Sequence, residues 1–466
     1  MPIATINPAD NSTVKEFEEF TDQHVDAAID AADIAYASWR ATDKRERAAL
    51  LARAAQLLAD RSDEFAPLLT VEMGKLIGES RDEVALASAI LQYYAENGEK
   101  MTADETIEVE NGSAVVRTSP IGTLLGVMPW NFPLYQVVRF VGPNLMLGNT
   151  VLIKHASSCP QSALALEKLF ADAGAPEGVY TNLFVSGNKI SRIIDNPKIK
   201  GVSLTGSERA GASVGERAGR NIKKAVLELG GSDPFIVLDD GGDFSRLIEG
   251  ATTGRMANTG QSCVAAKRFF VQRDLYDGFV SGLADALGHL RLGDPLDEST
   301  TLGPLSSEQA VEDLEELVQD ALDKGATAVV GGHRAGRPGA YFEATVLTGV
   351  TENMRAFGEE LFGPVAVVYA IADADDAVEK ANASNFGLGA TIFSGDVDAA
   401  KSVADRLDSG MVWINHPTGT APELPFGGTK RSGFGRELSH YGIGEFANRK
   451  LIRTLPKDSK ITGVGG

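Results

Sequence analysis

Cysteine is scarce in this sequence, and so are the features of a secreted or membrane protein. Cys159 and Cys263 are the only cysteines among 466 residues, too few for a disulfide framework, which indicates a reducing compartment. The opening residues, MPIATINPAD, lack the basic stretch and apolar core of a signal peptide. No run reaches the roughly 18 consecutive apolar residues that a membrane helix needs. We therefore expect a cytoplasmic protein without a membrane partner.

Clusters of basic residues are missing too. The chain has 44 Lys and Arg against 64 Asp and Glu, a net charge of −20, whereas binding to a phosphate backbone needs clustered positive charge. The run KRER at 44–47 is more typical of a solvated helix face. We expect no nucleic-acid partner. The acidity fits simple solubility, and it equally fits a salt-rich cytoplasm in which screening suppresses self-repulsion.

Motifs that bind metals and phosphates are also absent. The six histidines are scattered, and neither CxxC nor HExxH occurs, so we expect no metal site. Neither GxGxxG nor a Walker loop is present. The stretch GSERAG at 206–211 follows a predicted strand and opens a predicted helix, whose free N–H groups and dipole favour an anion. An ordinary strand–helix turn would have the same pattern.

Apolar spacing predicts an α/β protein. Residues 12–100 carry apolar side chains at steps of three and four, which predict helices. Short apolar runs follow, separated by helical segments such as 161–172 and 187–195, and this alternation predicts parallel sheets covered on both faces. The strands predicted in a first series are 121–128, 150–154, 182–185, 201–206 and 224–229. Those predicted in a second series are 234–238, 267–271, 327–332, 365–371, 390–394 and 411–415.

Two further features concern domain organisation. The second series of strands begins soon after Glu228, which places a domain boundary near 229–232. The stretch TIEVENGSAVVRTS at 106–119 alternates loosely around ENG, a pattern that predicts a β-hairpin. Such a hairpin between two α/β portions is suited to extend outward as an assembly arm.

Cys263 is a candidate nucleophile, in the flexible peptide NTGQSCVAAKRFF at 258–270. A lone thiol is more commonly an inert core residue. Here Gly260 allows a tight turn before it, and Lys267 and Arg268 lie close enough in sequence to favour a thiolate.

Two other polar residues stand out because they end apolar segments. Glu228 closes the predicted strand of LELGG, where a carboxylate is costly unless it is paired or functional, so it is a candidate general base with a raised pKa. In MPWNFP a strand is predicted to end at Asn131, and Pro133 suits the first position of a helix. An amide fixed there is able to donate to a developing oxyanion.

Six motifs together carry a resemblance to a known family. In chain order they are PWNFP (129–133), TGS (205–207), ELGG (228–231), GQSC (260–263), EELFGPV (359–365) and PFGGTKRSGFGRE (425–437). With these motifs, from about residue 7 to residue 450, the chain resembles the aldehyde dehydrogenase superfamily. The resemblance implies an α/β fold with a Rossmann-like cofactor domain, an α/β catalytic domain and a β-hairpin oligomerisation arm.

The resemblance also assigns the catalytic roles. It implies that Cys263 attacks the aldehyde carbon and that the Asn131 amide and the Cys263 N–H hold the hemithioacetal oxyanion. After hydride transfer to a nicotinamide, Glu228 activates water to hydrolyse the thioester. Sulfur suits this reaction because it is both a strong nucleophile and the leaving group of a hydrolysable acyl intermediate.

The cofactor implied is NADP or NAD. The residues that match the family's cofactor contacts are Trp130, Lys154, Gly206, Ser207, Glu360 and Phe362. Members that prefer NAD often have a glutamate three residues after the lysine, and this chain has Ser157 there. A hydroxyl accepts a neighbouring 2′-phosphate that a carboxylate would repel. We therefore favour NADP, or use of both cofactors.

The predicted substrate is an aldehyde with a distal carboxylate. Arg139, eight residues after Asn131, is normally a type of residue found on a solvated helix face, but the family's succinate-semialdehyde dehydrogenases are similar in placing an arginine there. Such an arginine can bind a carboxylate by a forked pair. Thr420 falls where those enzymes often place a carboxylate-binding serine. Many relatives have a second cysteine two residues after the nucleophile, and Ala265 occupies that position here.

The resemblance implies a division into domains and an assembly. We expect a cofactor-binding domain (1–104 and 121–229), a catalytic domain (230–440) and an oligomerisation arm (105–120 and 441–466) in a homodimer or homotetramer. The alternatives are a broad aliphatic or betaine-type aldehyde dehydrogenase, a cysteine amidase or nitrilase-type hydrolase, and a non-enzymatic structural relative.

Overall fold

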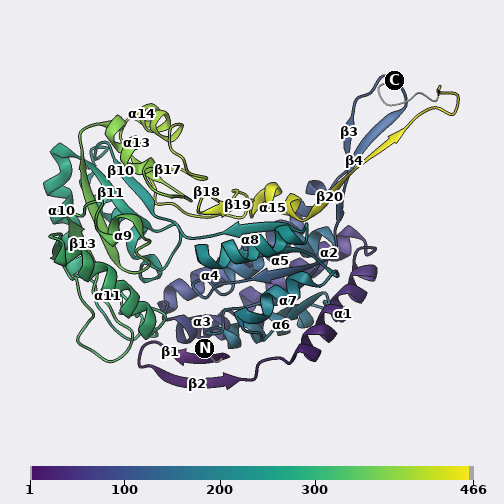
Figure 1. Ribbon diagram of the computed structural model, residues 1–466, viewed down its shortest axis with the longest axis horizontal. Helices are drawn as coiled ribbons and strands as arrows, with labels where there is room; N and C mark the ends of the chain where they lie inside the picture. The colour runs from purple at the N-terminus through teal and green to yellow at the C-terminus, as the bar shows by residue number, and fades with distance from the viewer. Residues whose placement is uncertain (1–2, 461–466) are drawn as a thin grey trace.

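The computed structural model describes residues 3–460. Figure 1 shows two lobes side by side along the long axis and a thin arm that projects from one of them. The two large sheets of the molecule have six and seven strands. Residues 1–2 and 461–466, which we assigned to the cofactor-binding domain and to the arm, lie outside the described range.

The chain begins with an antiparallel pair of strands, followed by helices. β1 (Ile3–Asn7) pairs with β2 (Ser12–Phe17), so the prediction of helix from residue 12 is wrong for β2. Its exposed, partly β-branched sequence STVKEF completes its hydrogen bonds on β1 instead of within a helix. The helices that follow are α1 (Asp22–Trp39), α2 (Lys44–Asp60), α3 (Ser62–Met73) and α4 (Ile77–Met101).

The first lobe is built on the six-stranded sheet, in the order β19-β9-β8-β5-β6-β7. Its neighbours are parallel except for β19, which is antiparallel to β9. The strands are β5 (Thr123–Val127), β6 (Thr150–Lys154), β7 (Tyr180–Asn182), β8 (Ile199–Thr205), β9 (Lys224–Glu228) and β19 (Gly433–Phe434). The helices between them are α5 (Tyr135–Leu147), α6 (Pro160–Asp172), η1 (Gly187–Lys189), α7 (Ile190–Asp195) and α8 (Glu208–Arg220).

The second lobe is built on the seven-stranded sheet, in the order β12-β13-β14-β11-β10-β16-β17. Only β12 is antiparallel to its neighbour. The strands are β10 (Asp233–Val237), β11 (Ala266–Gln272), β12 (Thr327–Val330), β13 (Thr345–Thr348), β14 (Val365–Ile371), β16 (Thr391–Phe393) and β17 (Trp413–Ile414). The helices are α9 (Phe244–Met256), η2 (Ala257–Gly260), α10 (Arg273–Gly288), α11 (Glu308–Asp323), α12 (Arg355–Gly358), α13 (Ala374–Asn382) and α14 (Val397–Ala404).

These two mostly parallel sheets confirm the predicted α/β fold. The central strands β5, β10 and β11 are buried on both faces, as continuous apolar runs require. The chain passes from the first sheet to the second between Glu228 and Asp233. It returns at β19, so Gly433–Phe434, which we assigned to the catalytic domain, pair in the sheet of the first lobe.

The arm is a three-stranded antiparallel ribbon. β3 (Glu105–Ile107) and β4 (Ser113–Pro120) form the predicted hairpin, and β20 (Ala447–Thr454) pairs along the whole of β4. Figure 1 shows this ribbon leaving the body of the molecule beside α15 (Ser439–Glu445). A small pair of strands, β15 (Phe386–Gly387) and β18 (Thr429–Lys430), lies nearer to the second lobe.

Some boundaries differ from the prediction. β5 ends at Val127 and α5 begins at Tyr135, so Asn131 and Pro133 lie in the turn between them, and neither ends a strand or begins the helix. β7 lies mostly before the predicted strand 182–185, because the residues that pair with β6 are Tyr180, Thr181 and Asn182.

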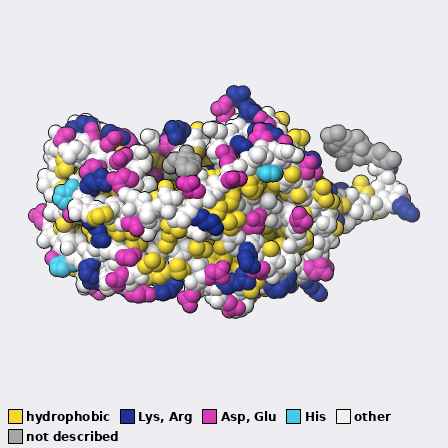
Figure 2. Space-filling model, turned by 90° about the horizontal axis from the view of Figure 1, so that it is seen from below, with side chains coloured by type: hydrophobic (Ala, Val, Ile, Leu, Met, Phe, Trp, Pro, Cys, Tyr) yellow, Lys and Arg dark blue, Asp and Glu magenta, His cyan; other side chains and the backbone are white. Residues whose placement is uncertain are grey.

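The outer surface carries mixed charge. No helix within residues 3–460 is both long and apolar enough to cross a bilayer. On the face shown in Figure 2, Lys and Arg side chains are interspersed with Asp and Glu.

Candidate active site

A cavity of about 280 Å³ brings together most of the predicted site residues. Its walls come from the ends of β8 and β9, from the turn after β5 and from loops of the second lobe. The lining residues are Pro129, Trp130, Asn131, Gln136, Thr205, Gly206, Ser207, Glu228, Leu229, Gly230, Cys263, Glu360 and Phe362. The three candidate catalytic residues therefore share one space, although more than a hundred residues separate Asn131 from Cys263.

A strained turn presents Cys263 to this cavity. Asn258, Thr259 and Gly260 have φ values of 56°, 53° and 74°, a left-handed conformation that a β-branched residue rarely adopts. A Cβ atom on Gly260 would lie 2.4 Å from the carbonyl oxygen of Gly363, so this position requires glycine. The Asn258 Nδ2 donates to the Gln261 carbonyl at 3.1 Å, which helps to fix the turn.

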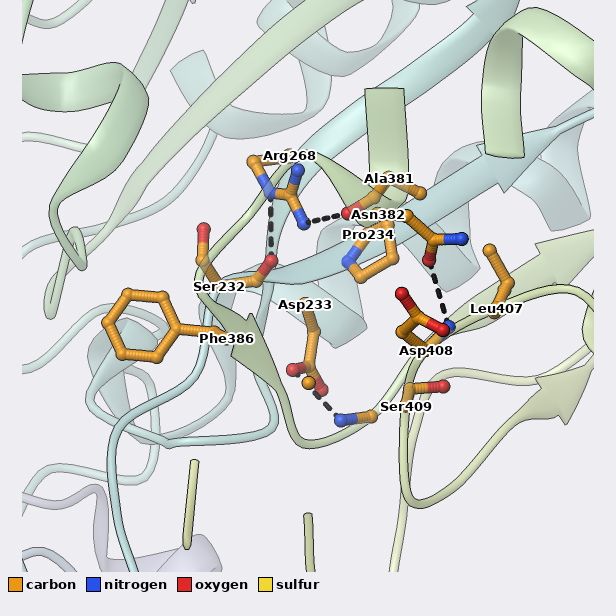
Figure 3. A pocket seen from close by; sticks show the side chains of 12 residues that line it. Ser232, Asp233, Pro234, Arg268, Ala381, Asn382, Phe386, Leu407, Asp408 and Ser409 are labelled. Atoms are coloured by element: carbon orange, nitrogen blue, oxygen red, sulfur yellow. Dashed lines mark hydrogen bonds between the residues drawn. The ribbon is translucent and has the colours of Figure 1, made fainter. Parts of the chain in front are cut away.

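The surroundings of Cys263 favour its thiol form. Burial raises its pKa to about 12, although Arg139 and Lys267 act to lower it. The Lys267 Nζ donates to the carbonyls of Ser262 and Cys263 at 2.8 and 2.9 Å. Arg268 instead directs its guanidinium to the backbone carbonyls of Ser232 and Ala381 (Figure 3) and to that of Lys380. The thiol therefore needs a proton acceptor before it can attack.

Asn131 lies directly against the nucleophile turn. Its side chain is 4% exposed, and its Nδ2 donates to the Gln261 carbonyl at 3.1 Å. In return, the Asn258 Nδ2 donates to the Asn131 carbonyl at 3.0 Å. These paired contacts keep the amide next to Cys263 in space.

Glu228 places an unpartnered carboxyl group in the cavity. It ends β9, as predicted, and is 2% exposed. Neither carboxyl oxygen has a hydrogen-bond partner among the described residues. Burial raises the pKa of Glu228 well above its usual range, against the opposing effect of Arg139 and with a further increase from Glu437. A carboxyl group held in this way can accept a proton at higher pH than an ordinary glutamate.

The predicted cofactor residues divide into two groups. Trp130 and Phe362 face each other edge-on, with ring centroids 5.7 Å apart, and the Glu360 Oε1 accepts from Gly231 N at 3.0 Å. Ser207 caps α8 by accepting from the Ala210 N–H. Gly206 also lines the cavity. Lys154, at the end of β6, and Ser157, in the turn before α6, lie outside the cavity lining.

Arg139 is not free on a helix surface. It is 0% exposed on α5 and forms an ion pair with Glu437. It also donates to the Tyr135 hydroxyl at 3.1 Å and to the Thr205 Oγ1 at 3.3 Å. Burial opposes the charge of Arg139, but Glu437, Tyr135 and Glu228 together outweigh this effect and raise the arginine pKa.

Thr420 lines a second cavity, of about 360 Å³, together with Trp413 and Phe426. Its Oγ1 lies 3.0 Å from the Tyr135 hydroxyl, the group to which Arg139 also donates. The two predicted substrate residues are therefore joined through one phenol.

Sequence reasoning missed the residues that support this site. Tyr135 lies one helical turn before Arg139, a spacing that was available as an indication, and Gln136 beside it lines the catalytic cavity. Glu437 carried no local indication of an ion pair with a residue so distant in sequence. Arg255, also buried, donates to the carbonyls of Leu361 and Val365, both at 2.8 Å, and so ties α9 to the segment that carries Glu360.

A small cavity beside β10 contains another buried acid. It has a volume of about 10 Å³, enough for roughly one water molecule. Figure 3 shows Asp233 at its wall, and Asp233 Oδ1 accepts from Gly389 N at 3.0 Å. Burial raises the pKa of Asp233 to about 7, although Lys267 acts to lower it. Within residues 3–460, no three His, Cys, Asp or Glu side chains are grouped as a metal site would require.

The chain is similar to known proteins over nearly its whole length. Residues 1–452 match the model of the aldehyde dehydrogenase family. A succinate-semialdehyde dehydrogenase [NADP(+)] of Deinococcus radiodurans is 58% identical over 100% of this chain and 97% of its own. Succinate-semialdehyde dehydrogenase [NADP(+)] 1 of Mycobacterium bovis is 46% identical over 97% of this chain and 99% of its own.

A solved structure extends the similarity to three dimensions. Succinic semialdehyde dehydrogenase from Streptococcus pyogenes, in complex with NADP+ as the cofactor, superimposes with a TM-score of 0.95 at 42% identity. The alignment covers 97% of this chain and 100% of that one. With a family model matched over nearly its whole length and relatives this similar, the chain belongs to the aldehyde dehydrogenase family.

Proposed function

We propose that this protein oxidises succinate semialdehyde to succinate, with NADP as the preferred acceptor. The observation that carries the reaction type is the meeting of Cys263, Asn131 and Glu228 in one cavity of about 280 Å³. The substrate and cofactor are supported by the similar relatives from Deinococcus radiodurans and Streptococcus pyogenes, whose names specify both.

The reaction begins at the Cys263 sulfur. Glu228, when deprotonated, takes the thiol proton, and the thiolate forms a C–S bond to the aldehyde carbon while the carbonyl becomes an oxyanion. The Asn131 amide and the Cys263 N–H donate to that oxyanion, and loss of one such donor typically costs about 10²–10³ in rate. A bound nicotinamide dinucleotide supplies the acceptor for the hydride that leaves as the hemithioacetal becomes a thioester.

Glu228 acts again in the second half of the reaction, after the proton that it took from the thiol has been released to solvent. It takes a proton from water as the water oxygen attacks the thioester carbonyl. The C–S bond then breaks, the acid leaves, and the proton returns to the Cys263 sulfur. The absence of a hydrogen-bond donor on either Glu228 oxygen among the described residues supports this role, because the carboxylate is not occupied by a structural contact.

The residues around the cavity fit a dinucleotide. Gly206 and Ser207 lie at the N-terminus of the 13-residue helix α8, where free N–H groups suit a pyrophosphate. Glu360 lies against Gly230, where a Cβ atom would lie 2.3 Å from a carboxylate oxygen, so only glycine leaves that carboxylate its place. Trp130 and Phe362 are assigned to the nicotinamide side, and Lys154 to the adenosine ribose.

The preference for NADP rests on Ser157. Its backbone carbonyl accepts from Ala4 N at 3.0 Å, which anchors the turn between β6 and α6 to strand β1. A hydroxyl at this position donates to a 2′-phosphate, where the glutamate of NAD-preferring relatives would repel it.

We assign the carboxylate of the substrate to the N-terminal end of α5. Thr420 and the Tyr135 hydroxyl are 3.0 Å apart, and Arg139 donates to that hydroxyl from behind. Arg139 therefore acts on the substrate through Tyr135 as well as through its charge, which Glu437 partly neutralises.

We also propose the division of labour and the assembly. The six-stranded lobe (1–104 and 121–229) binds the cofactor, the region 230–440 carries the nucleophile, and the arm (105–120 and 441–466) joins subunits into a homodimer or homotetramer.

The reduction of nicotinamide tests the function directly. We expect absorbance of the reduced cofactor to rise with succinate semialdehyde, faster with NADP than with NAD, and more slowly with hexanal. Equal turnover of both aldehydes would indicate a broad aliphatic enzyme. No turnover by folded protein with either cofactor would contradict the proposal.

A further inference from the structure

Three charged residues outside the cavity contact both segments that form the proposed oxyanion site. Lys75, Glu79 and Glu83 lie just before α4 and in its first two turns, and none of them lines the catalytic cavity. Lys75 is 1% and Glu83 3% exposed. Charged side chains buried to this degree are costly unless they form specific contacts.

Glu79 holds the nucleophile turn. Its Oε1 accepts from the backbone N–H of Asn258 at 2.7 Å, at the first of the three left-handed residues that precede Cys263. Such strained backbone persists only where its surroundings hold it. Glu79 supplies one of the contacts that do so, from a helix of the other lobe.

Lys75 and Glu83 hold the segment that carries Asn131. The Glu83 Oε1 accepts from the backbone N–H groups of Leu134 and Tyr135 at 2.8 and 3.0 Å, where α5 has free donors. Lys75 forms an ion pair with Glu83, and its Nζ lies 3.8 Å from the ring centroid of Phe132, the residue after Asn131.

We propose that these three residues, the α4 brace, set the position of the Asn131 amide relative to Cys263. Glu79 and Glu83 are four residues apart and so lie on one face of the helix. The Glu79 carboxylate contacts the turn before Cys263 in the second lobe. The Glu83 carboxylate contacts the segment that follows Asn131 in the first lobe. The brace fixes the distance across which an oxyanion must be bound. Its members are positioning residues, because they touch neither the substrate nor the reacting atoms.

The proposal rests on the roles proposed for Asn131 and Cys263, so its test avoids nicotinamide and succinate semialdehyde. p-Nitrophenyl acetate acylates a reactive thiol through an oxyanion, and release of p-nitrophenol in a single turnover measures that step. Iodoacetamide alkylates the same thiol without forming an oxyanion. The ratio of the two rates therefore reports the oxyanion site and not the thiol alone.

Glu79→Ala is the main variant. We expect it to slow acylation about 10- to 100-fold, since a misplacement of about 1 Å costs up to roughly 10²-fold, and to change alkylation by less than about twofold. Glu79→Gln, which keeps an acceptor for the Asn258 N–H, is expected to retain most of the acylation rate. The matched control is Glu167→Ala, which removes a carboxylate that accepts from Asn182 N at 2.8 Å far from the cavity.

A double-mutant cycle gives the decisive result. If Glu79 acts by setting the position of Asn131 relative to Cys263, Glu79→Ala slows acylation much less in an Asn131→Ala background than in the wild type. A loss of equal size in both backgrounds, or an equal loss in alkylation, would overturn the brace. Should Glu79→Ala fail to fold, Glu79→Asp, which retracts the carboxylate by one methylene, takes its place in the cycle with the same expectations.

The result is independent of the physiological substrate. Wild-type protein that acylates but does not oxidise succinate semialdehyde would refute the proposed function, and the cycle would still decide on the brace. Wild-type protein whose thiol is alkylated but not acylated would overturn the oxyanion role of Asn131, and the brace with it.

Discussion

Two buried glutamates of the first lobe differ in their hydrogen-bond partners, and this difference separates a structural role from a chemical one. Glu72 accepts hydrogen bonds from Thr5 Oγ1, Gln161 N, and the N and Oγ of Ser162, at 2.6–3.0 Å. Glu228 is nearly as buried and has no partner on either oxygen among the described residues. A satisfied carboxylate stabilises the fold, whereas an unsatisfied one costs stability and is free to meet water and substrate.

The Glu228→Gln variant is expected to slow both halves of the reaction. Gln cannot take a proton from the thiol or from water, so steady-state turnover should fall by about 10²–10⁴, and the stoichiometric burst of reduced nicotinamide should form more slowly than in the wild type. In the wild type, the raised pKa of Glu228 means that turnover increases with pH through a range above that of an ordinary carboxyl group. Rapid-mixing and pH–rate measurements check both points. A burst as fast as that of the wild type would show that a group other than Glu228 deprotonates the thiol.

Asp233 gives a prediction about stability and pH. Its folded-state pKa of about 7 lies above an unfolded value of about 3.9. Between these values the folded protein keeps a proton that the unfolded chain has lost, so this group makes stability fall as pH rises toward 7. Asp233→Asn keeps an acceptor for the Gly389 N–H and removes this loss of stability with rising pH.

The measurement is the difference in melting temperature between variant and wild type. We expect Asp233→Asn to melt higher than the wild type at pH 8, with the advantage shrinking toward pH 4. A difference that stays constant across this range would mean that Asp233 titrates at its ordinary value.

At the scale of elements, α5 combines a structural and a recognition role. All its residues, Tyr135–Leu147, are buried, including Arg139 with its Glu437 partner. Replacing one member of a buried ion pair leaves the other charge uncompensated, at a cost of about 3–5 kcal/mol. A simple Arg139→Ala substitution therefore confuses loss of folding with loss of substrate binding.

The double substitution Arg139→Met with Glu437→Gln separates the two effects. It removes both charges, so we expect a melting temperature near that of the wild type. We also expect kcat/KM for succinate semialdehyde to fall at least about tenfold, which corresponds to about 1.4 kcal/mol, with hexanal little changed. Parallel assays of both aldehydes check this. An equal loss on both would remove Arg139 from substrate recognition.

The sequence predicted elements well where local pattern decides them. β6 and β14 match the predicted bounds, because uninterrupted apolar runs specify buried strands. Glu228 and Lys154 were placed at strand ends for the same reason. β13, β19 and β20 were missed because they are short or exposed and are specified by their pairing partners.

The contacts that support the site could not be predicted from local patterns in the sequence. The ion pair between Arg139 and Glu437 and the contact between Glu79 and Asn258 join residues far apart in the chain. Spacing and composition carry no record of such pairs, because they depend on how the lobes pack. Arg139 was consequently expected to lie open to a substrate, and its buried partner was not foreseen.

At the scale of the whole molecule, the arm is notable because it projects from the body and exposes apolar side chains. A three-stranded ribbon has little core of its own, and β20 exposes Leu451 to 61% and the following Leu455 to 52%. Exposed apolar side chains on a projecting ribbon favour contact with another copy of the chain.

Leu451→Asp is expected to weaken assembly. The added charge would be buried in the subunit contact, so light scattering coupled to size-exclusion chromatography should show a smaller species. The matched control is Lys450→Glu, because neighbouring residues on a strand face opposite sides. An unchanged mass for Leu451→Asp would place the subunit contact elsewhere.

The late return of the chain to the first lobe matters for a polypeptide that is still being made. β19, which completes the sheet beside Glu228, and Glu437, the partner of Arg139, follow all the proposed cofactor, catalytic and substrate residues in sequence. On the ribosome, the thiol, the amide and the base all emerge before the strand that pairs with β9 and the glutamate that pairs with Arg139. A nascent chain that has not reached Glu437 thus holds Arg139 without its counter-charge and the sheet without its edge, and the enzyme gains its working geometry only after these residues have been made.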